Sequence, residues 1–171
     1  MGTSERKPGR WHIYGVRVRY QETDGMGVVY HANYINWFEI GRTELIRDRG
    51  YPYRSIEERG LYLPVVDLEC KFHRPARYDD LIAIYTRVAA YNALTLEFES
   101  QIRRASAADE QAERADPQAS AAYAAAPRAM LEPEGELLVS GKTRHVWLNR
   151  DWKPARLDRE LPELMRLLGD E

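Results

Sequence analysis

The chain has 171 residues, 44% of them hydrophobic, which is enough for one domain whose core needs no disulfide or metal to be stable. Its formal net charge of −2 provides no basic field of the kind that attracts nucleic acid, so we expect no nucleic-acid partner. Segment 1–10 is polar and lacks the apolar region of a signal peptide, and no apolar run approaches the ~20 residues that span a bilayer. We therefore expect a flexible N-terminal tail at 1–10, a single domain at 11–171, no membrane span and a cytoplasmic location.

The first two predicted elements are a strand and a long helix. Over residues 14–20 apolar and polar side chains alternate, which is the period of a strand with one buried face. The turn-like segment 21–27 follows, and apolar residues then recur at helical spacing over 33–49. Asn33 is a candidate N-cap and Gly50 a typical stop signal, so the sequence bounds this helix at both ends.

Four further runs with strand periodicity are predicted, at 66–72, 81–88, 94–102 and 137–148. The second, third and fourth strands of the chain are separated by short turn-like segments, which favours antiparallel hairpins. Cys70, the single cysteine, alternates with apolar neighbours, and we interpret it as a buried strand residue without a redox role.

Segment 105–134 interrupts this pattern before the last strand. It is rich in alanine, contains three prolines and shows no sustained period, so we predict a mobile insertion with about one helical turn. A short C-terminal helix is predicted over 157–168, with Asp158 as a possible N-cap and Pro162 tolerated in its first turn. One antiparallel sheet packed on one long helix is an α+β plan.

The segment from Tyr20 to Tyr34 joins the first strand to the helix and holds the densest group of unusual residues, including Asp24, Gly25 and His31. A carboxylate beside a helix N-terminus is well placed for reaction at a carbonyl group, because the terminal N–H groups can hold a developing oxyanion. The same carboxylate can instead serve only to accept hydrogen bonds from the turn. These residues by themselves leave both interpretations open.

This segment reads Tyr-x-x-Thr-Asp-x-x-Gly-Val-Val-Tyr-His-x-x-Tyr and closely resembles the bacterial acyl-CoA thioesterase branch of the 4-hydroxybenzoyl-CoA thioesterase family. A second stretch with the form Pro-Ala-x-x-x-Asp, at 75–80, resembles a strand-turn element of the same family. The resemblance spans about 16–104 and resumes at 137. The insertion at 105–134 is the chief departure from the family pattern.

The resemblance implies a hot-dog fold, in which a long central helix is wrapped by a curved antiparallel sheet of about five strands. It maps the catalytic carboxylate of the family onto Asp24 and two further site residues onto Tyr20 and His31. It also implies a backbone N–H donor near His31, a site between subunits, and assembly as a homodimer or homotetramer. No metal and no cofactor are implied.

The function implied is hydrolysis of acyl-CoA or acyl-carrier thioesters, with Asp24 acting as nucleophile or as general base. Two alternatives are a non-catalytic acyl-CoA-binding protein and a hot-dog hydratase or dehydratase. The latter enzymes carry an Asp-x-Asn-Pro-x-His pattern, whereas here Asp24 and His31 are seven positions apart without an Asn-Pro between them. The acyl group itself has no signature in the sequence.

Other polar residues carry weaker signals. Glu39 and Glu44 lie on opposite sides of the predicted helix, and Glu39 is the better candidate for a place near the site. The remaining histidines lack the spacing of a transition-metal site. Basic residues that could pair with CoA phosphates are Arg74, Arg77, Lys142 and Arg144.

Overall fold

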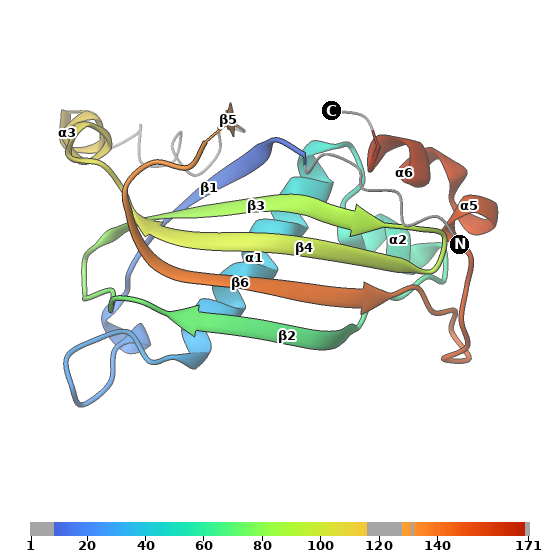
Figure 1. Ribbon diagram of the computed structural model, residues 1–171, viewed down its shortest axis with the longest axis horizontal. Helices are drawn as coiled ribbons and strands as arrows, with labels where there is room; N and C mark the ends of the chain where they lie inside the picture. The colour runs from blue at the N-terminus through green and yellow to red at the C-terminus, as the bar shows by residue number, and fades with distance from the viewer. Residues whose placement is uncertain (1–8, 116–127, 131, 170–171) are drawn as a thin grey trace.

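The computed structural model describes residues 9–115, 128–130 and 132–169 (Figure 1). A curved antiparallel sheet has the strand order β2-β6-β4-β3-β1-β5, and the long helix α1 (Ala32–Asp48) lies across one face of it. The predicted α+β hot-dog fold is therefore confirmed. The strands are β1 (Trp11–Arg17), β2 (Val65–Phe72), β3 (Leu81–Tyr91), β4 (Thr95–Arg104), β5 (Arg128–Met130) and β6 (Glu136–Val146). The shorter helical segments are η1 (Tyr20–Glu22), α2 (Tyr53–Glu58), α3 (Ala107–Ala115), α5 (Leu157–Glu160) and α6 (Pro162–Leu167).

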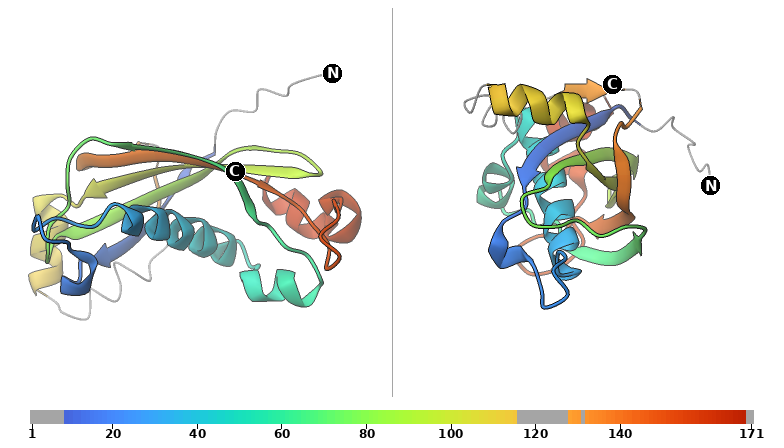
Figure 2. Two further views of the ribbon diagram at one scale, coloured as in Figure 1. Left: turned by 90° about the horizontal axis from the view of Figure 1, so that it is seen from below. Right: turned by 90° about the vertical axis from the view of Figure 1, so that its left-hand side faces the viewer.

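Helix α1 packs closely against the middle of the sheet, as Figure 2 shows from the side. A Cβ atom on Gly41 would collide with the side chain of Thr86 on β3, so only glycine permits this approach. Phe38, one of the largest fully buried side chains, lies against Gly141 of β6. The predicted apolar stripe of the helix thus faces the core, and it positions the N-terminus of α1 at one end of the sheet.

Strand β1 begins three residues earlier than the alternation predicted, and one of its faces is buried while the other is partly buried. Tyr14 packs toward α1, while Trp11 and Ile13 form a second small cluster with Tyr85 on the opposite face of the sheet. β5 pairs with β1, and the N–H of Glu134 donates to the Tyr85 hydroxyl at 3.1 Å. The expectation that only one face is covered was wrong, because the insertion contributes cover on that side.

Strand β2 is more exposed to solvent than the sequence predicted. It forms one edge of the sheet, and its apolar side chains Val66 and Phe72 are 51% and 53% exposed. Cys70 is only half-buried, although burial still raises the pKa of its thiol. The expectation of a buried cysteine was therefore wrong, because an edge strand has a neighbouring strand on one side only.

Two of the predicted helix boundaries also differ. Helix α1 begins at Ala32, and the Asn33 side chain donates to the carbonyl of Glu22 instead of capping the helix. The C-terminal helix is divided into α5 and α6, because Pro162 lacks an N–H and starts a new helix. Asp158 lies inside α5 and pairs with Arg156 at 2.8 Å, so it is not the N-cap.

Part of segment 105–134 has regular structure, namely α3 and β5, which exceeds the single helical turn expected. The predictions of a mobile segment at 116–127 and of a flexible tail at 1–8 fall outside the described residues. Among the described residues, no helix is long and apolar enough to cross a membrane.

Candidate active site

A pocket of about 260 Å³ lies between the loop that precedes α1 and the turn that follows β2. Its walls combine apolar side chains with a few polar groups, as expected of a small-molecule site. The lining residues are Asp24, Met26, Val28, Val29, His31, Tyr34, Phe72, His73, Arg74 and Pro75. Two segments that carry the family resemblance and are more than 40 residues apart in the sequence therefore meet at one cavity.

Asp24 sits in a tight loop, with its backbone N–H bonded to the carbonyl of Val28 at 2.9 Å. Gly27 has a φ of +73°, a conformation that glycine adopts without strain. The Asp24 Oδ1 atom accepts a hydrogen bond from the N–H of Met26 at 2.8 Å, so the carboxylate does stabilise the turn. Oδ2 has no hydrogen-bond partner among the described residues, which leaves it available to a ligand in the pocket.

His31 immediately precedes α1 and also lines the pocket. Its ring lies 4.4 Å from the ring of Tyr30 and meets Phe72 edge-on at 6.4 Å, so two aromatic neighbours hold it. The N–H groups of Asn33 and Tyr34 are bonded to the carbonyls of Tyr30 and His31. Within the described part of the chain, this leaves the N–H groups of His31 and Ala32 without acceptors, as is usual at a helix N-terminus.

Tyr20, the third predicted site residue, does not line the pocket. Its side chain is 78% exposed and meets Tyr78 edge-on at 5.6 Å. The structure therefore brings Asp24 and His31 together and places Tyr20 on the outside of the same loop system.

Tyr34 fastens the two walls of the pocket to each other. Its hydroxyl accepts a hydrogen bond from the N–H of Ala76 at 2.9 Å, and the carbonyl of Ala76 accepts one from the N–H of Val29 at 2.9 Å. Burial raises the pKa of Tyr34, so the phenol stays neutral at physiological pH. The turn after β2 is thus bonded both to α1 and to the loop that carries Asp24.

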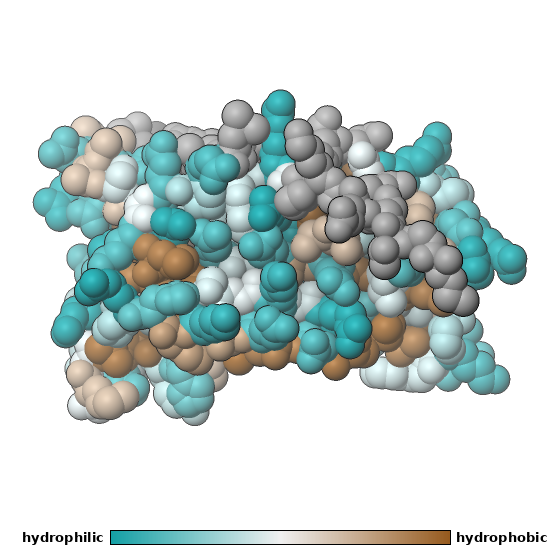
Figure 3. Space-filling model, in the orientation of Figure 1, coloured by the Kyte–Doolittle hydropathy of each residue, from teal (hydrophilic) through white to brown (hydrophobic). Residues whose placement is uncertain are grey.

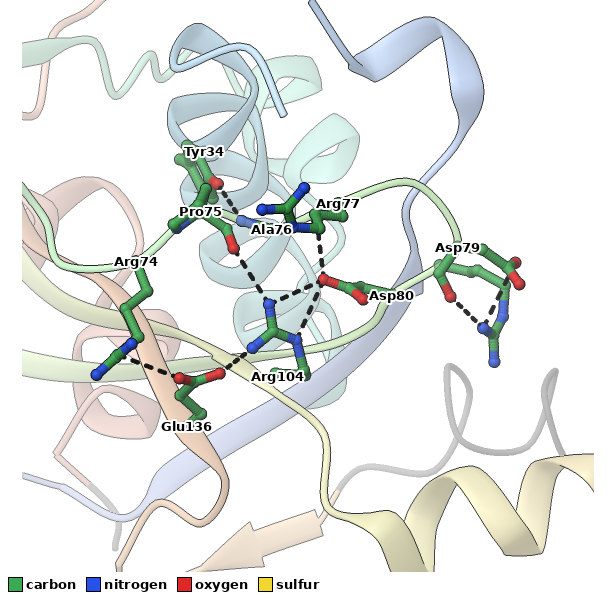
Figure 4. A network of polar contacts seen from close by, with 10 residues as sticks. Tyr34, Arg74, Pro75, Ala76, Arg77, Asp79, Asp80, Arg104 and Glu136 are labelled. Atoms are coloured by element: carbon green, nitrogen blue, oxygen red, sulfur yellow. Dashed lines mark hydrogen bonds and ion pairs between the residues drawn. The ribbon is translucent and has the colours of Figure 1, made fainter. Parts of the chain in front are cut away.

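Arg104, the last residue of β4, organises the same turn from the other side (Figure 4). Its guanidinium donates to the carbonyl of Pro75 at 3.1 Å and to Asp80 Oδ2 at 3.1 Å, and it also pairs with Glu136. Asp80 Oδ2 accepts the N–H of Arg77 at 2.9 Å as well. One side chain from a neighbouring strand thereby holds both ends of the Pro-Ala turn.

The weaker candidates are distributed differently. Glu39 is exposed and Glu44 pairs with Arg47 at 3.2 Å, and neither lines the pocket. Arg74 lines the pocket but pairs with Glu136 at 3.2 Å. The strand positions of Lys142 and Arg144 put them on the face of the sheet away from α1.

Sequence reasoning missed Arg104 because its partners are 24 to 32 residues away and no local pattern marks it. It also missed Phe72 as a pocket residue, although this side chain directly precedes the Pro-Ala motif. Among the described residues, no group of three histidine, cysteine or carboxylate side chains is arranged to hold a metal.

Comparison with known proteins gives a consistent result. Residues 18–164 match the family model described as the thioesterase-like superfamily. The putative acyl-CoA thioesterase YneP of Bacillus subtilis is 30% identical over 149 residues, which cover 86% of this chain and 88% of that protein. The acyl-CoA thioesterase YbgC of Haemophilus influenzae is 37% identical over 92 residues, covering 53% of this chain and 68% of the relative.

Among solved structures, the DHNA-CoA thioesterase of Staphylococcus aureus superposes with a TM-score of 0.74 and 29% sequence identity. The match covers 93% of this chain and 89% of that structure. A 1,4-dihydroxy-2-naphthoyl-CoA thioesterase from Synechocystis superposes with a TM-score of 0.69 at 18% identity, and it supports the fold alone.

Proposed function

Because the chain belongs to the thioesterase-like superfamily, we propose that it hydrolyses acyl-CoA thioesters in the pocket that contains Asp24 and His31. Thioester hydrolysis as the reaction class is supported by the named activities of its relatives. The observation that carries the choice of site is the shared cavity. The Asp24 Oδ2 atom, which has no partner within the described part of the chain, borders the same apolar space as the His31 ring and the N-terminus of α1.

The reaction adds water across the C–S bond and releases a carboxylic acid and a thiol. Along one route the Asp24 carboxylate attacks the thioester carbonyl and the C–S bond breaks. The thiolate that leaves takes a proton from solvent, and water then hydrolyses the mixed anhydride to the carboxylic acid and free Asp24. Along the other route Asp24 removes a proton from water, which attacks the carbonyl directly. Along both routes the N–H groups of His31 and Ala32 at the start of α1 can stabilise the oxyanion. His31 orients the thioester or the water.

We further propose that the enzyme is a homodimer joined along β2. An edge strand presents unpaired backbone groups to any complementary strand. The exposed apolar residues Val65, Val66 and Phe72 add a hydrophobic contribution along this edge. A second copy of the chain satisfies both requirements.

The substrate class is tested by a panel of short aliphatic, long aliphatic and aromatic acyl-CoA thioesters, assayed by the release of free thiol. The relative from Staphylococcus aureus acts on DHNA-CoA, so aromatic thioesters belong in the panel. If the parent protein binds these thioesters and hydrolyses none of them, it is a binding protein and the proposed activity is wrong.

The role of Asp24 is tested by Asp24→Asn, which keeps the shape of the side chain and an oxygen acceptor for Met26 while removing the charge. We expect hydrolysis to fall by roughly 10²- to 10⁴-fold or more, since general-base assistance alone contributes that much. Thioester binding and the unfolding midpoint should remain near those of the parent. A folded variant that retains nearly the parental rate on every substrate would show that Asp24 is only a turn residue.

A further inference from the structure

Several of the exposed large apolar side chains lie on β2 and on the loops near its two ends. Figure 3 shows hydrophobic residues in brown along its lower edge, which is the edge where β2 lies in Figure 1. The exposed side chains come from β2, from the Asp24 loop and from the loop that follows β6, and they include Val65, Phe72, Met26, Tyr30 and Trp152. A group of exposed apolar residues of this kind marks an interaction surface.

Pairing two copies of β2 about a twofold axis makes the two strands antiparallel, so each end of β2 meets the opposite end of its partner. The Phe72 end borders the Asp24 pocket. The Val65 end pairs with the end of β6, where the chain continues into the loop at 149–153. Figure 1 shows these two loops at opposite ends of β2. Twofold pairing therefore directs the loop at 149–153 of one subunit toward the Asp24 pocket of the other.

Trp152 in this loop is held in an unusual conformation. Its φ is +58°, which is rare for a bulky side chain, and the side chain is 68% exposed. Asn149 closes the loop, since its Oδ1 atom accepts the N–H groups of Asp151 and Lys153, each at 3.0 Å. The Trp152 ring lies 6.3 Å from the ring of Tyr62, which supports it from one side. A strained, well-fastened loop that displays an indole to solvent indicates a binding role for the indole.

We propose that Trp152 of each subunit covers the Asp24 pocket of the partner subunit and contacts the apolar part of the bound thioester. The inference rests on the proposed function and on the β2 dimer. It explains why the pocket is open on the side of Met26 and Phe72, whose side chains are 79% and 53% exposed. A second aromatic group there removes water from the site and enlarges the apolar contact with the acyl chain.

The first test compares Trp152→Asn with Trp152→Phe. Asparagine tolerates positive φ, so the loop keeps its backbone while the ring is removed, and phenylalanine retains an aromatic ring. We expect Trp152→Asn to raise KM by roughly threefold to tenfold, because the loss of one aromatic contact weakens binding by about that factor. The KM of Trp152→Phe should lie close to that of the parent. An unchanged KM for every thioester with Trp152→Asn would overturn the proposal.

The second test asks whether Trp152 acts across the interface. Asp24→Asn and Trp152→Asn chains with different affinity tags are co-expressed, and the heterodimer is purified. One of its two sites combines an intact Asp24 with the intact Trp152 of the other chain, and the second site lacks both. We expect about half of the parental kcat with the parental KM. A heterodimer with the raised KM of the Trp152→Asn homodimer would show that Trp152 acts within its own subunit, and would overturn the proposal.

Failure of the proposed function is distinguishable, because it appears as a parent protein that binds the thioesters and hydrolyses none of them. Tryptophan fluorescence can then still report whether a bound thioester covers Trp152. The other three tryptophans are only 0–2% exposed, so a quencher in solution reaches Trp152 preferentially. Acrylamide quenching that distinguishes the parent from Trp152→Phe therefore reports on Trp152 alone. We expect saturating acyl-CoA to protect Trp152 from quenching in the Asp24→Asn protein, which binds without turnover. Full quenching of Trp152 in that complex would contradict the proposal.

Discussion

At the scale of single residues, His145 shows how the fold controls an ionisable group in the core. The ring is fully buried, its Nε2 atom bonds to the Thr143 hydroxyl at 2.9 Å, and its Nδ1 atom lies 3.3 Å from the carbonyl of Leu63. Burial, reinforced by the charge of Arg42, lowers the pKa of His145 from the ordinary value of 6.5 to about 4. The native protein therefore keeps this ring neutral at pH values where an exposed histidine is charged.

This shift predicts a loss of stability in acid. The unfolded chain takes up a proton below about pH 6.5 and the native state does not, so the contribution of His145 is complete above pH 6.5 and lost as the pH falls to about 4. At about 1.4 kcal/mol per pH unit, the loss is on the order of 3 kcal/mol. Urea unfolding of the parent and of His145→Gln at several pH values should show this loss. The free energy of unfolding should depend more steeply on pH in the parent than in the variant. Carboxylates titrate in both proteins, so equal slopes would contradict the prediction.

At the scale of elements, the turn after β2 depends on a side chain from β4. We expect Arg104→Met to raise KM more than it lowers kcat, because the loosened turn forms a wall of the pocket and contains no reacting group. The free energy of unfolding should fall by about 1–3 kcal/mol, because Arg104 makes hydrogen bonds to charged groups at a half-buried site. Arg104→Lys should recover part of both effects, since it keeps the charge.

The matched control is Arg54→Met, which removes an exposed ion pair with Glu58 on α2. Exposed pairs contribute about 0–1 kcal/mol, so this variant should be close to the parent in stability and in KM. If Arg104→Met behaves in the same way as Arg54→Met in urea unfolding and in steady-state kinetics, the turn does not depend on Arg104.

At the scale of the whole molecule, the exposed edge of β2 predicts the state of assembly. Val66→Lys places a charge among exposed apolar residues of this edge and should convert the dimer into a monomer near 19.9 kDa. Leu94→Lys, at another exposed apolar residue outside the β2 edge, is the control and should remain dimeric. Sedimentation velocity at micromolar concentration distinguishes the two. A parent protein that sediments as a monomer would contradict the proposed homodimer.

Local sequence patterns predicted most of the elements and the centre of the candidate site. Apolar periodicity identified α1 and five of the six strands, because side-chain spacing reports directly on helix and strand geometry. The motif around Asp24 and His31 and the Pro-Ala motif were both found in the sequence, and the structure places them around one pocket. The catalytic roles of these residues stay predictions until the variants are measured.

Tertiary packing decided the rest. The packing of side chains on both faces of β1 and the exposure of β2 depend on which strands and segments become neighbours. Alternation along one strand cannot show this. Arg104 reaches the Pro-Ala turn only because β4 and β6 bring residues far apart in the sequence together. Tyr20 shares the Asp24 motif and still points away from the pocket, since the backbone turns between the two residues. A sequence specifies local periods and residue chemistry, whereas exposure and convergence of side chains are properties of the folded chain.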